Sequence, residues 1–147
     1  MARAEQIGFV GIGNMGAPMV RCLLQAKHAV AIFDADAKAM APFRDTAGVR
    51  IAPSLPVLAA QCATIITMLP DSKIVRRVVL GTRGSPGLAD GLGHDSLLID
   101  MSSSYPLDTV RLGADLKRRG AALIDAPVSG GVGKAVTGTL EIGRAHV

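Results

Sequence analysis

A glycine-spaced turn near the amino terminus constrains the fold more than any other feature. Gly11, Gly13 and Gly16 fit the pattern G-x-G-x-x-G and follow an apolar segment that ends at Val10. We expect Gly11 to permit the tight turn, Gly13 to let backbone approach a pyrophosphate, and Gly16 to let the next helix pack closely on the sheet. A helix from about Asn14 would present its first N–H groups to phosphates. The sequence therefore predicts a strand–turn–helix unit that binds a dinucleotide.

An acidic residue after the second apolar strand favours the same interpretation. Residues 29–33 read AVAIF, and Asp34 follows Gly11 by 23 residues. This is near the spacing at which a carboxylate meets the ribose hydroxyls of a dinucleotide. Ala35 and Asp36 add a second carboxylate and no cation where a 2′-phosphate would lie, so NAD is favoured over NADP. Asp36 also fits the cap of a short helix. A turn with no ligand is the structural alternative.

Four segments together resemble one enzyme family. The opening GFVGIGNMGAPMVRCLLQAKHAVAIFD is followed by ATIITMLPDS at 63–72, LLIDMSSSYP at 97–106 and IDAPVSGGV at 124–132. Their order and content resemble the β-hydroxyacid dehydrogenase family, which includes enzymes that act on 3-hydroxyisobutyrate, tartronate semialdehyde and 6-phosphogluconate. The resemblance covers residues 6 to about 140. It implies the amino-terminal NAD-binding domain of a 3-hydroxyacid dehydrogenase.

The resemblance also implies cofactor contacts at two later strand ends. The apolar run 63–69 is typical of a strand buried on both faces, and its end carries the Leu-Pro that lies against the cofactor in the family. Ser103 stands where relatives usually carry threonine, and its hydroxyl would bond the nicotinamide ribose or carboxamide. Ser102 and Ser104 are interpreted as caps of the following helix. The predicted NAD site comprises Gly11, Ile12, Gly13, Asn14, Met15, Gly16, Asp34, Met68, Leu69, Pro70 and Ser103.

The segment after the sixth strand is the predicted substrate site. In the family a Pro-Val-Ser-Gly-Gly segment holds the substrate carboxylate, which implies this role for Ser129, Gly130 and Gly131. Adjacent glycines let backbone N–H groups converge on an anion. A flexible loop is the alternative. Lys134 follows a glycine, but the surrounding residues do not fit a phosphate-binding loop, so it is not assigned as catalytic.

The rest of the family's enzyme has no counterpart in this sequence. The family's catalytic lysine lies in a Lys-x-x-x-Asn helix beyond the Gly-Gly segment, and an all-helical second domain follows. We therefore expect a truncated, catalytically inactive fragment with residues 1–140 as the dinucleotide-binding domain. Residues 141–147 read EIGRAHV, which matches the translation of a common sequencing adapter. We expect this segment to be a non-native tail that adds nothing to the fold.

Length and composition fit one α/β domain. The 147 residues are 49% hydrophobic and 19% charged. Together with the motifs they predict a Rossmann-type, doubly wound, mainly parallel sheet with strand order 3-2-1-4-5-6. Residues 54–61 are interpreted as purely structural and the glycine-rich segment 81–93 as a connector. A stand-alone nucleotide-binding or regulatory module is the alternative function, and a methyltransferase is a weaker one that the Leu-Pro and Ser-Gly-Gly segments oppose.

Charge and rare residues argue against other classes of partner. The net charge of +4 is scattered, and three Phe, one Tyr and no Trp give few rings for bases to stack on, so nucleic acid is not an expected partner. Cys22 and Cys62 match no metal-ligand spacing, so no metal is expected. The longest apolar stretch is too short to span a bilayer. We expect a cytoplasmic protein that acts on a small hydroxyacid, and the resemblance implies homo-oligomers for the full-length relatives.

Overall fold

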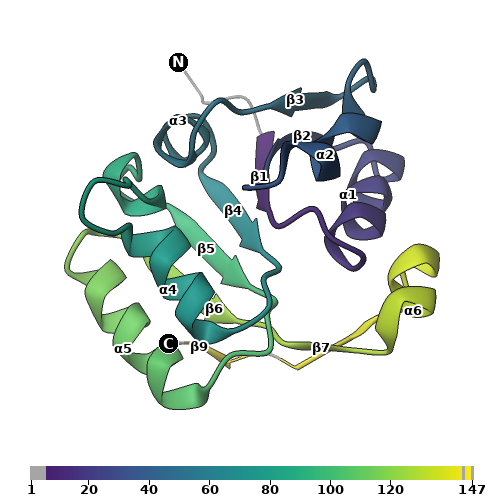
Figure 1. Ribbon diagram of the computed structural model, residues 1–147. Coiled ribbons are helices and arrows are strands. Elements are labelled where there is room, and N and C mark those ends of the chain that lie inside the picture. Colours follow the sequence, from purple (N-terminus) through teal and green to yellow (C-terminus); the bar gives the residue numbers. More distant parts are fainter. Residues whose placement is uncertain (1–5, 144, 147) are drawn as a thin grey trace.

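The computed structural model describes residues 6–143 and 145–146, and it consists of one large sheet with helices on both faces (Figure 1). The large sheet has seven strands in the order β3-β2-β1-β4-β5-β6-β9, of which the first six are parallel and β9 is antiparallel. The predicted order 3-2-1-4-5-6 and the Rossmann-type fold are thus confirmed. The large-sheet strands are β1 (Gln6–Val10), β2 (Ala29–Phe33), β3 (Val49–Ile51), β4 (Thr64–Thr67), β5 (Leu97–Asp100), β6 (Ala122–Asp125) and β9 (Ala145–His146).

In the described residues six α-helices connect or follow these strands, and three of them begin at a side-chain cap. The helices are α1 (Gly16–Gln25), α2 (Ala37–Met40), α3 (Leu55–Gln61), α4 (Ser72–Leu80), α5 (Pro106–Lys117) and α6 (Gly131–Thr137). Asp36, Ser54 and Asp71 each accept a hydrogen bond from a backbone N–H in the first turn of the helix that follows. The predicted cap at Asp36 is therefore confirmed.

Two helices differ from the predicted bounds. The first begins at Gly16, so that Asn14 and Met15 belong to the turn. The helix after Asp36 ends at Met40 and continues as a 3₁₀ turn over Ala41–Phe43. Pro42 has no N–H to donate back along the helix, which explains why the chain tightens there.

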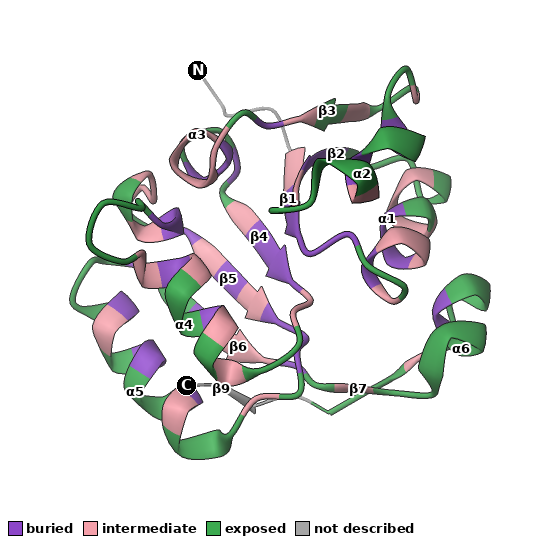
Figure 2. Cartoon of the chain, viewed as in Figure 1, coloured by how far each residue is buried: buried purple, intermediate pink, exposed green. Residues whose placement is uncertain are grey.

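The two faces of the sheet carry separate apolar cores, because successive side chains of a strand point to opposite faces. One core contains Ile65 and Leu98 and packs beneath α3, α4 and α5. The other contains Phe9 and Ile66 and packs beneath α1, α2 and α6. Figure 2 shows buried residues along the central strands and exposed ones on the outer sides of the helices. The carboxyl ends of the parallel strands lie at one edge between these two layers.

Four residues of the segment 141–147 pair with the domain, which differs from the expectation that this segment adds nothing to the fold. β8 (Glu141–Ile142) pairs antiparallel with β7 (Val128–Ser129), and β9 pairs antiparallel with β6. Neither pairing could be read from the sequence, because each ladder has only two residues and no hydrophobic alternation of its own. The prediction that the sequence of this segment is non-native stays a prediction.

Among the described residues, no helix combines the length and the apolar composition that crossing a bilayer requires.

Candidate dinucleotide site

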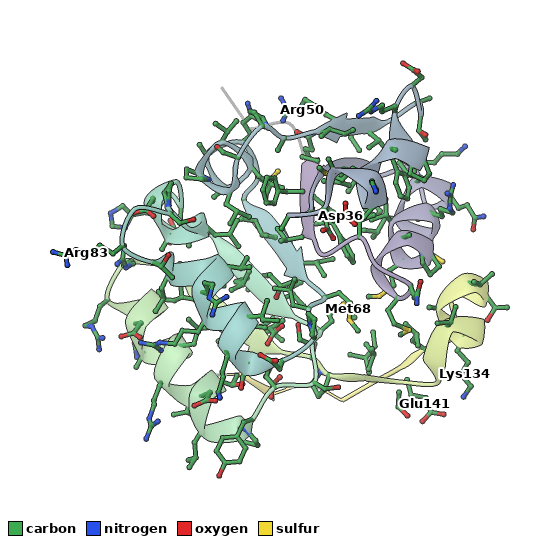
Figure 3. All side chains as sticks on the ribbon, in the orientation of Figure 1. Asp36, Arg50, Met68, Arg83, Lys134 and Glu141 are labelled. Atoms are coloured by element: carbon green, nitrogen blue, oxygen red, sulfur yellow. The ribbon has the colours of Figure 1, made fainter. Side chains whose placement is uncertain are left out.

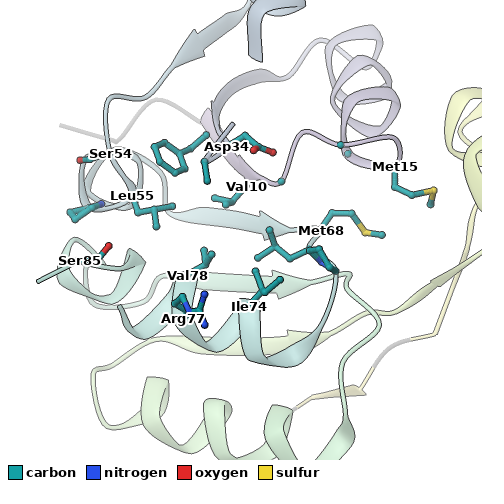
Figure 4. Close-up of a pocket in the computed structure, with 18 of the residues that line it drawn as sticks. Val10, Met15, Asp34, Ser54, Leu55, Met68, Ile74, Arg77, Val78 and Ser85 are labelled. Carbon is teal, nitrogen blue, oxygen red and sulfur yellow. The ribbon is translucent and has the colours of Figure 1, made fainter. Parts of the chain in front are cut away.

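A pocket of about 760 Å³ opens at the carboxyl ends of β1, β2 and β4. β1 lies between β2 and β4, so the strand order reverses at this point, where doubly wound sheets bind their ligands. Figure 4 shows Met68 beside the end of β4, Asp34 above this strand and α4 below it. Nine of the residues predicted for the NAD site line this pocket: Gly11, Gly13, Asn14, Met15, Gly16, Asp34, Met68, Leu69 and Pro70.

The three glycines of the turn have different surroundings. Gly11 has φ +101°, and a Cβ there would collide with the carbonyl oxygen of Met68. A Cβ on Gly16 would collide with the carbonyl oxygen of Gly11. The tight turn and the close helix packing predicted for these two positions are therefore confirmed. Gly13 differs, because it is exposed and a Cβ there would meet no protein atom within 4 Å. Its missing side chain leaves open space beside the pocket.

Asp34 connects the glycine turn to the segment after β2. Its Oδ2 accepts a hydrogen bond of 2.7 Å from the backbone N–H of Ile12, and its Oδ1 accepts one of 2.8 Å from the N–H of Asp36. Each carboxylate oxygen can accept a further bond, so both remain able to meet a ligand hydroxyl. The side chain of Ile12 is 2% exposed and lies in the core rather than along the pocket.

The ends of β4 and β5 are joined by a buried polar network. Asp100 accepts hydrogen bonds from the hydroxyls of Thr67 and Ser104 and from the backbone N–H of Ser102. The hydroxyl of Ser102 in turn accepts a bond of 2.9 Å from the N–H of Leu69. Ser102 and Ser104 are therefore not helix caps. The N-cap of α5 is Tyr105, which makes no side-chain cap bond.

Ser103 lies between these two serines but does not line the pocket. It is exposed, whereas Ser102 is fully buried and Ser104 is partly buried. The structure thus places the three serines differently, and Ser103 is the exposed one. Its contact with a cofactor stays a prediction.

A carboxyl group at the end of β6 lies beside the same network. Asp125 and Asp100 are register partners in the parallel pairing of β5 and β6. Burial raises the pKa of Asp125 above its ordinary value of 3.8, and the negative charge of Asp100 raises that pKa further. Asp125 therefore releases its proton less readily than an isolated carboxyl group does.

The predicted substrate residues lie on a separate segment. Ser129 ends β7 and is exposed, and Gly130 and Gly131 lead into α6 with φ values of +129° and +68°. None of the three lines the large pocket. Lys134 lies within 3.4 Å of the carboxylate of Glu141, and Figure 3 shows both side chains beside α6, well apart from Met68 at the end of β4.

Part of the pocket wall was not predicted. Pro53, Ser54, Leu55 and Pro56 line the pocket at the start of α3, although residues 54–61 were interpreted as purely structural. Ser85 and Pro86 come from the segment interpreted as a connector, and Ile74, Arg77 and Val78 come from α4. The spacing of Ile74 and Val78 is a signal that could have been used, because residues i and i+4 share a helix face. That face begins directly after the Leu-Pro at the end of β4.

Comparison with known proteins gives a family and several relatives. The model for the NAD binding domain of 6-phosphogluconate dehydrogenase matches residues 6–143, and this range includes the first three residues of the segment 141–147. The chain is 42% identical to 3-sulfolactaldehyde reductase of Escherichia coli K12 over 135 residues, which are 91% of this chain and 44% of the relative. It is 37% identical to the mitochondrial 3-hydroxyisobutyrate dehydrogenase of Bos taurus over 140 residues, which are 95% of this chain and 40% of the relative.

Solved structures agree with these relatives. A 3-hydroxyisobutyrate dehydrogenase of Mycobacterium tuberculosis with L-serine has a TM-score of 0.83 and 35% identity, over 95% of this chain and 46% of that chain. Psf3 in complex with NADP⁺ and 2-OPP has a TM-score of 0.88 and 25% identity, over 96% and 49%. The chain thus spans less than half the length of these relatives. It belongs to the family of the NAD-binding domain of 6-phosphogluconate dehydrogenase, together with the corresponding domains of hydroxyacid dehydrogenases.

Proposed function

We propose that this chain binds NAD in preference to NADP, as the cofactor half of an enzyme that transfers hydride between NAD and a small 3-hydroxyacid. The observation that carries the proposal is the convergence of Asp34 and the glycine turn on one pocket at the switch in strand order. The protein's own packing explains why Gly11 and Gly16 lack side chains, but it does not explain Gly13. A pyrophosphate that approaches the backbone at Gly13 supplies the reason.

The preference for NAD follows from the charges at one end of the pocket. Asp34 lines the pocket, Asp36 is close enough to donate its backbone N–H to Asp34, and Ala35 between them adds no charge. A 2′-phosphate placed there would meet two carboxylates and no cation from this segment. Ribose hydroxyls, in contrast, can donate to the free lone pairs of Asp34. A structural neighbour holds NADP⁺, so the preference of this chain has to be measured.

The remaining walls suit the rest of a dinucleotide. Leu55, Ile74 and Val78 present apolar surface across the pocket from the glycine turn, as Figure 4 shows, and such surface favours a flat base. Bound NAD supplies the hydride acceptor. The chain's own residues bind the phosphates at the start of α1, hold the ribose at Asp34 and exclude water along the apolar wall.

The substrate class is proposed from the relatives and the glycine pair. Sulfolactaldehyde and hydroxyisobutyrate, named in two relatives, are both small molecules with an anionic group. Ser129, Gly130 and Gly131 would hold such a group through the serine hydroxyl and backbone N–H groups. Oxidation of an alcohol also needs a group that takes the hydroxyl proton, which typically contributes ~10² to 10⁴ in rate. We assign no residue of this chain to that role and therefore propose cofactor binding without turnover for these 147 residues.

Fluorescence titration of the purified chain with NADH and NADPH tests the proposal. We expect NADH to bind more tightly by about tenfold or more, because a phosphate beside a carboxylate costs at least ~1.4 kcal/mol at short range. Tighter binding of NADPH would contradict the assignment of Asp34.

A steady-state assay with NAD and a panel of 3-hydroxyacids tests the proposal that the chain binds the cofactor without turnover. Turnover at ordinary enzyme rates that Lys134→Ala abolishes would show that Lys134 was wrongly set aside.

A further inference from the structure

A buried carboxylate lies beneath the strand ends that form the candidate site. Asp100 is 1% exposed, and the described part of the chain contains no ion pair that involves it. It accepts hydrogen bonds of 2.9 Å from Thr67 Oγ1, 3.1 Å from Ser102 N and 2.8 Å from Ser104 Oγ. Burying a carboxylate without a cation is costly unless hydrogen bonds compensate it. An apolar residue at this position would have avoided the cost of burying a charge. The carboxylate instead has three hydrogen-bond donors placed around it.

One of these donors extends the network to the pocket wall. Ser102, held by Asp100 through its backbone N–H, accepts the N–H of Leu69 on its own hydroxyl at 2.9 Å. Leu69 lines the pocket and lies just beyond the end of β4, which ends at Thr67. Its N–H bonds to the Ser102 side chain and not to a neighbouring strand. Asp100 therefore fixes the backbone that leaves β4 through a single intermediate residue.

The same carboxylate fixes both neighbours of Ser103. Ser102 donates its backbone N–H to Oδ1 and Ser104 donates its hydroxyl to Oδ2, so both neighbours of the exposed residue Ser103 are held. A residue held in this way loses little conformational freedom when it contacts a ligand, which reduces the entropy cost of binding.

We propose that Asp100 is a positioning residue, which holds Leu69 and Ser103 in place for the dinucleotide at the ends of β4 and β5. The inference rests on the proposed NAD function and extends it to a residue that does not line the pocket. Removal of the carboxylate leaves the Thr67 and Ser104 hydroxyls and the Ser102 amide without their partner, so the two loops can shift independently.

The test compares three variants with a control in the purified chain. Asp100→Ala removes all three acceptor contacts, and Ser102→Ala removes only the link to Leu69. Asp100→Asn is the conservative variant, because an amide can still accept from Ser102 and can donate to the Ser104 hydroxyl. Leu116→Val is the control. Leu116 is fully buried on α5 and lies outside the network, so its truncation lowers stability without removing a bond of the network.

Two measurements separate positioning from general stability. Amide hydrogen exchange at Leu69, followed by NMR without cofactor, should become about tenfold faster in Asp100→Ala and Ser102→Ala, as expected for loss of one hydrogen bond. Affinity for NADH should fall about fivefold to tenfold in the same two variants. Asp100→Asn should recover most of both properties. Leu116→Val should lower the melting temperature and leave both properties unchanged.

The outcomes distinguish the inference from the proposed function. Failure of the wild-type chain to bind NADH would overturn the proposed function itself. Wild-type binding that Asp100→Ala and Ser102→Ala leave unchanged would overturn only the positioning role. If Asp100→Ala does not fold, Ser102→Ala and Asp100→Asn decide the question. Equal losses of affinity in Leu116→Val and Ser102→Ala would show that stability, not position, is responsible.

Discussion

The two halves of the sheet contribute to the candidate site in different ways. In the first half, the glycine turn after β1, Asp34 after β2 and Met68 to Pro70 after β4 all reach one pocket. In the second half, Ser103 after β5 and Ser129 at the end of β7 are exposed and lie outside that pocket. The first half lines the pocket that we propose for the dinucleotide, whereas the second half contributes Asp100 and Ser102, which bond to Thr67 and Leu69 at the end of β4.

This difference shows what a short motif can specify by itself. A Cβ on Gly16 would meet the carbonyl oxygen of Gly11 in the same motif, and a Cβ on Gly11 would meet that of Met68 beside the end of the neighbouring strand. In both places the missing side chain lets two backbone segments approach. The network around Asp100 depends instead on contacts such as that with Thr67, 33 residues earlier. Such contacts exist only once β4 and β5 have paired in register.

The largest expected effects come from two glycines of the same turn. Gly16→Ala should destabilise the chain by about 1–3 kcal/mol, since its Cβ would overlap the Gly11 carbonyl oxygen. Gly13→Ala should leave the melting temperature nearly unchanged, because no protein atom lies near its Cβ, but it should weaken NADH binding at least about tenfold. Thermal unfolding and NADH titration of both variants measure this contrast. A Gly13→Ala protein with wild-type affinity would show that the open space beside Gly13 does not receive the pyrophosphate.

Asp34 should have the next largest effect. Asp34→Ala removes the acceptor of both the Ile12 and Asp36 amides and of the proposed ribose hydroxyls. We expect NADH affinity to fall by about 1.5–3 kcal/mol, the range for hydrogen bonds to a charged group. Asp36→Ala is the matched control, because it removes a neighbouring carboxylate and the cap of α2 but leaves the Asp34 side chain in place. Equal affinity losses in the two variants would contradict a specific role for Asp34.

Arg77 tests the part of the pocket that the sequence did not reveal. It lines the pocket on α4, whereas its neighbour Arg76 forms an ion pair with Asp115. Arg77→Ala should weaken the binding of the anionic dinucleotide about twofold to fivefold, as expected for a cation near a ring or a phosphate at an exposed position. Arg76→Ala should leave it unchanged. Equal titration curves for the wild type and Arg77→Ala would remove α4 from the binding surface.

Sequence reasoning was most successful where spacing alone determines position. The strand order, the cap at Asp36, and the convergence of Asp34 with the glycine turn all follow from local pattern and the handedness of parallel connections. Sequence reasoning was less successful for serine, which can either cap a helix or bond to a strand end. Ser102 and Ser104 precede a helix as caps do, yet their hydroxyls bond to the strand ends, and only the paired strands reveal which use applies.

The segment 141–147 illustrates a second limit. Its match to a translated sequencing adapter suggested a tail outside the fold, but backbone pairing depends on geometry at the sheet edge and not on side-chain pattern. Deletion of residues 141–147 should lower the melting temperature by only a few degrees. The two ladders are short and the Lys134–Glu141 pair is exposed, so the loss is about 1 kcal/mol. A thermal scan that shows no change would restore the original expectation, and a loss of cooperative unfolding would show that β9 is essential to the sheet edge.

The smallest expected effect concerns Asp125, the acid beside the Asp100 network. Its pKa is raised by burial and by the charge of Asp100, so the folded chain holds this proton more tightly than the unfolded chain does. The stabilisation is therefore complete below the ordinary pKa of 3.8 and is lost as the pH rises through the higher folded value. Asp125→Asn should then unfold at a slightly higher temperature than the wild type at pH 7, by at most a few degrees because Asp125 is partly exposed and screened. The difference should vanish at about pH 3, where both side chains are neutral.

NMR titration of the Asp125 carboxyl group provides the direct check, and Asp100→Asn should lower the measured pKa because one of its two causes is removed. A wild-type Asp125 that titrates at or below 3.8 would show that the two strand ends do not influence each other electrostatically.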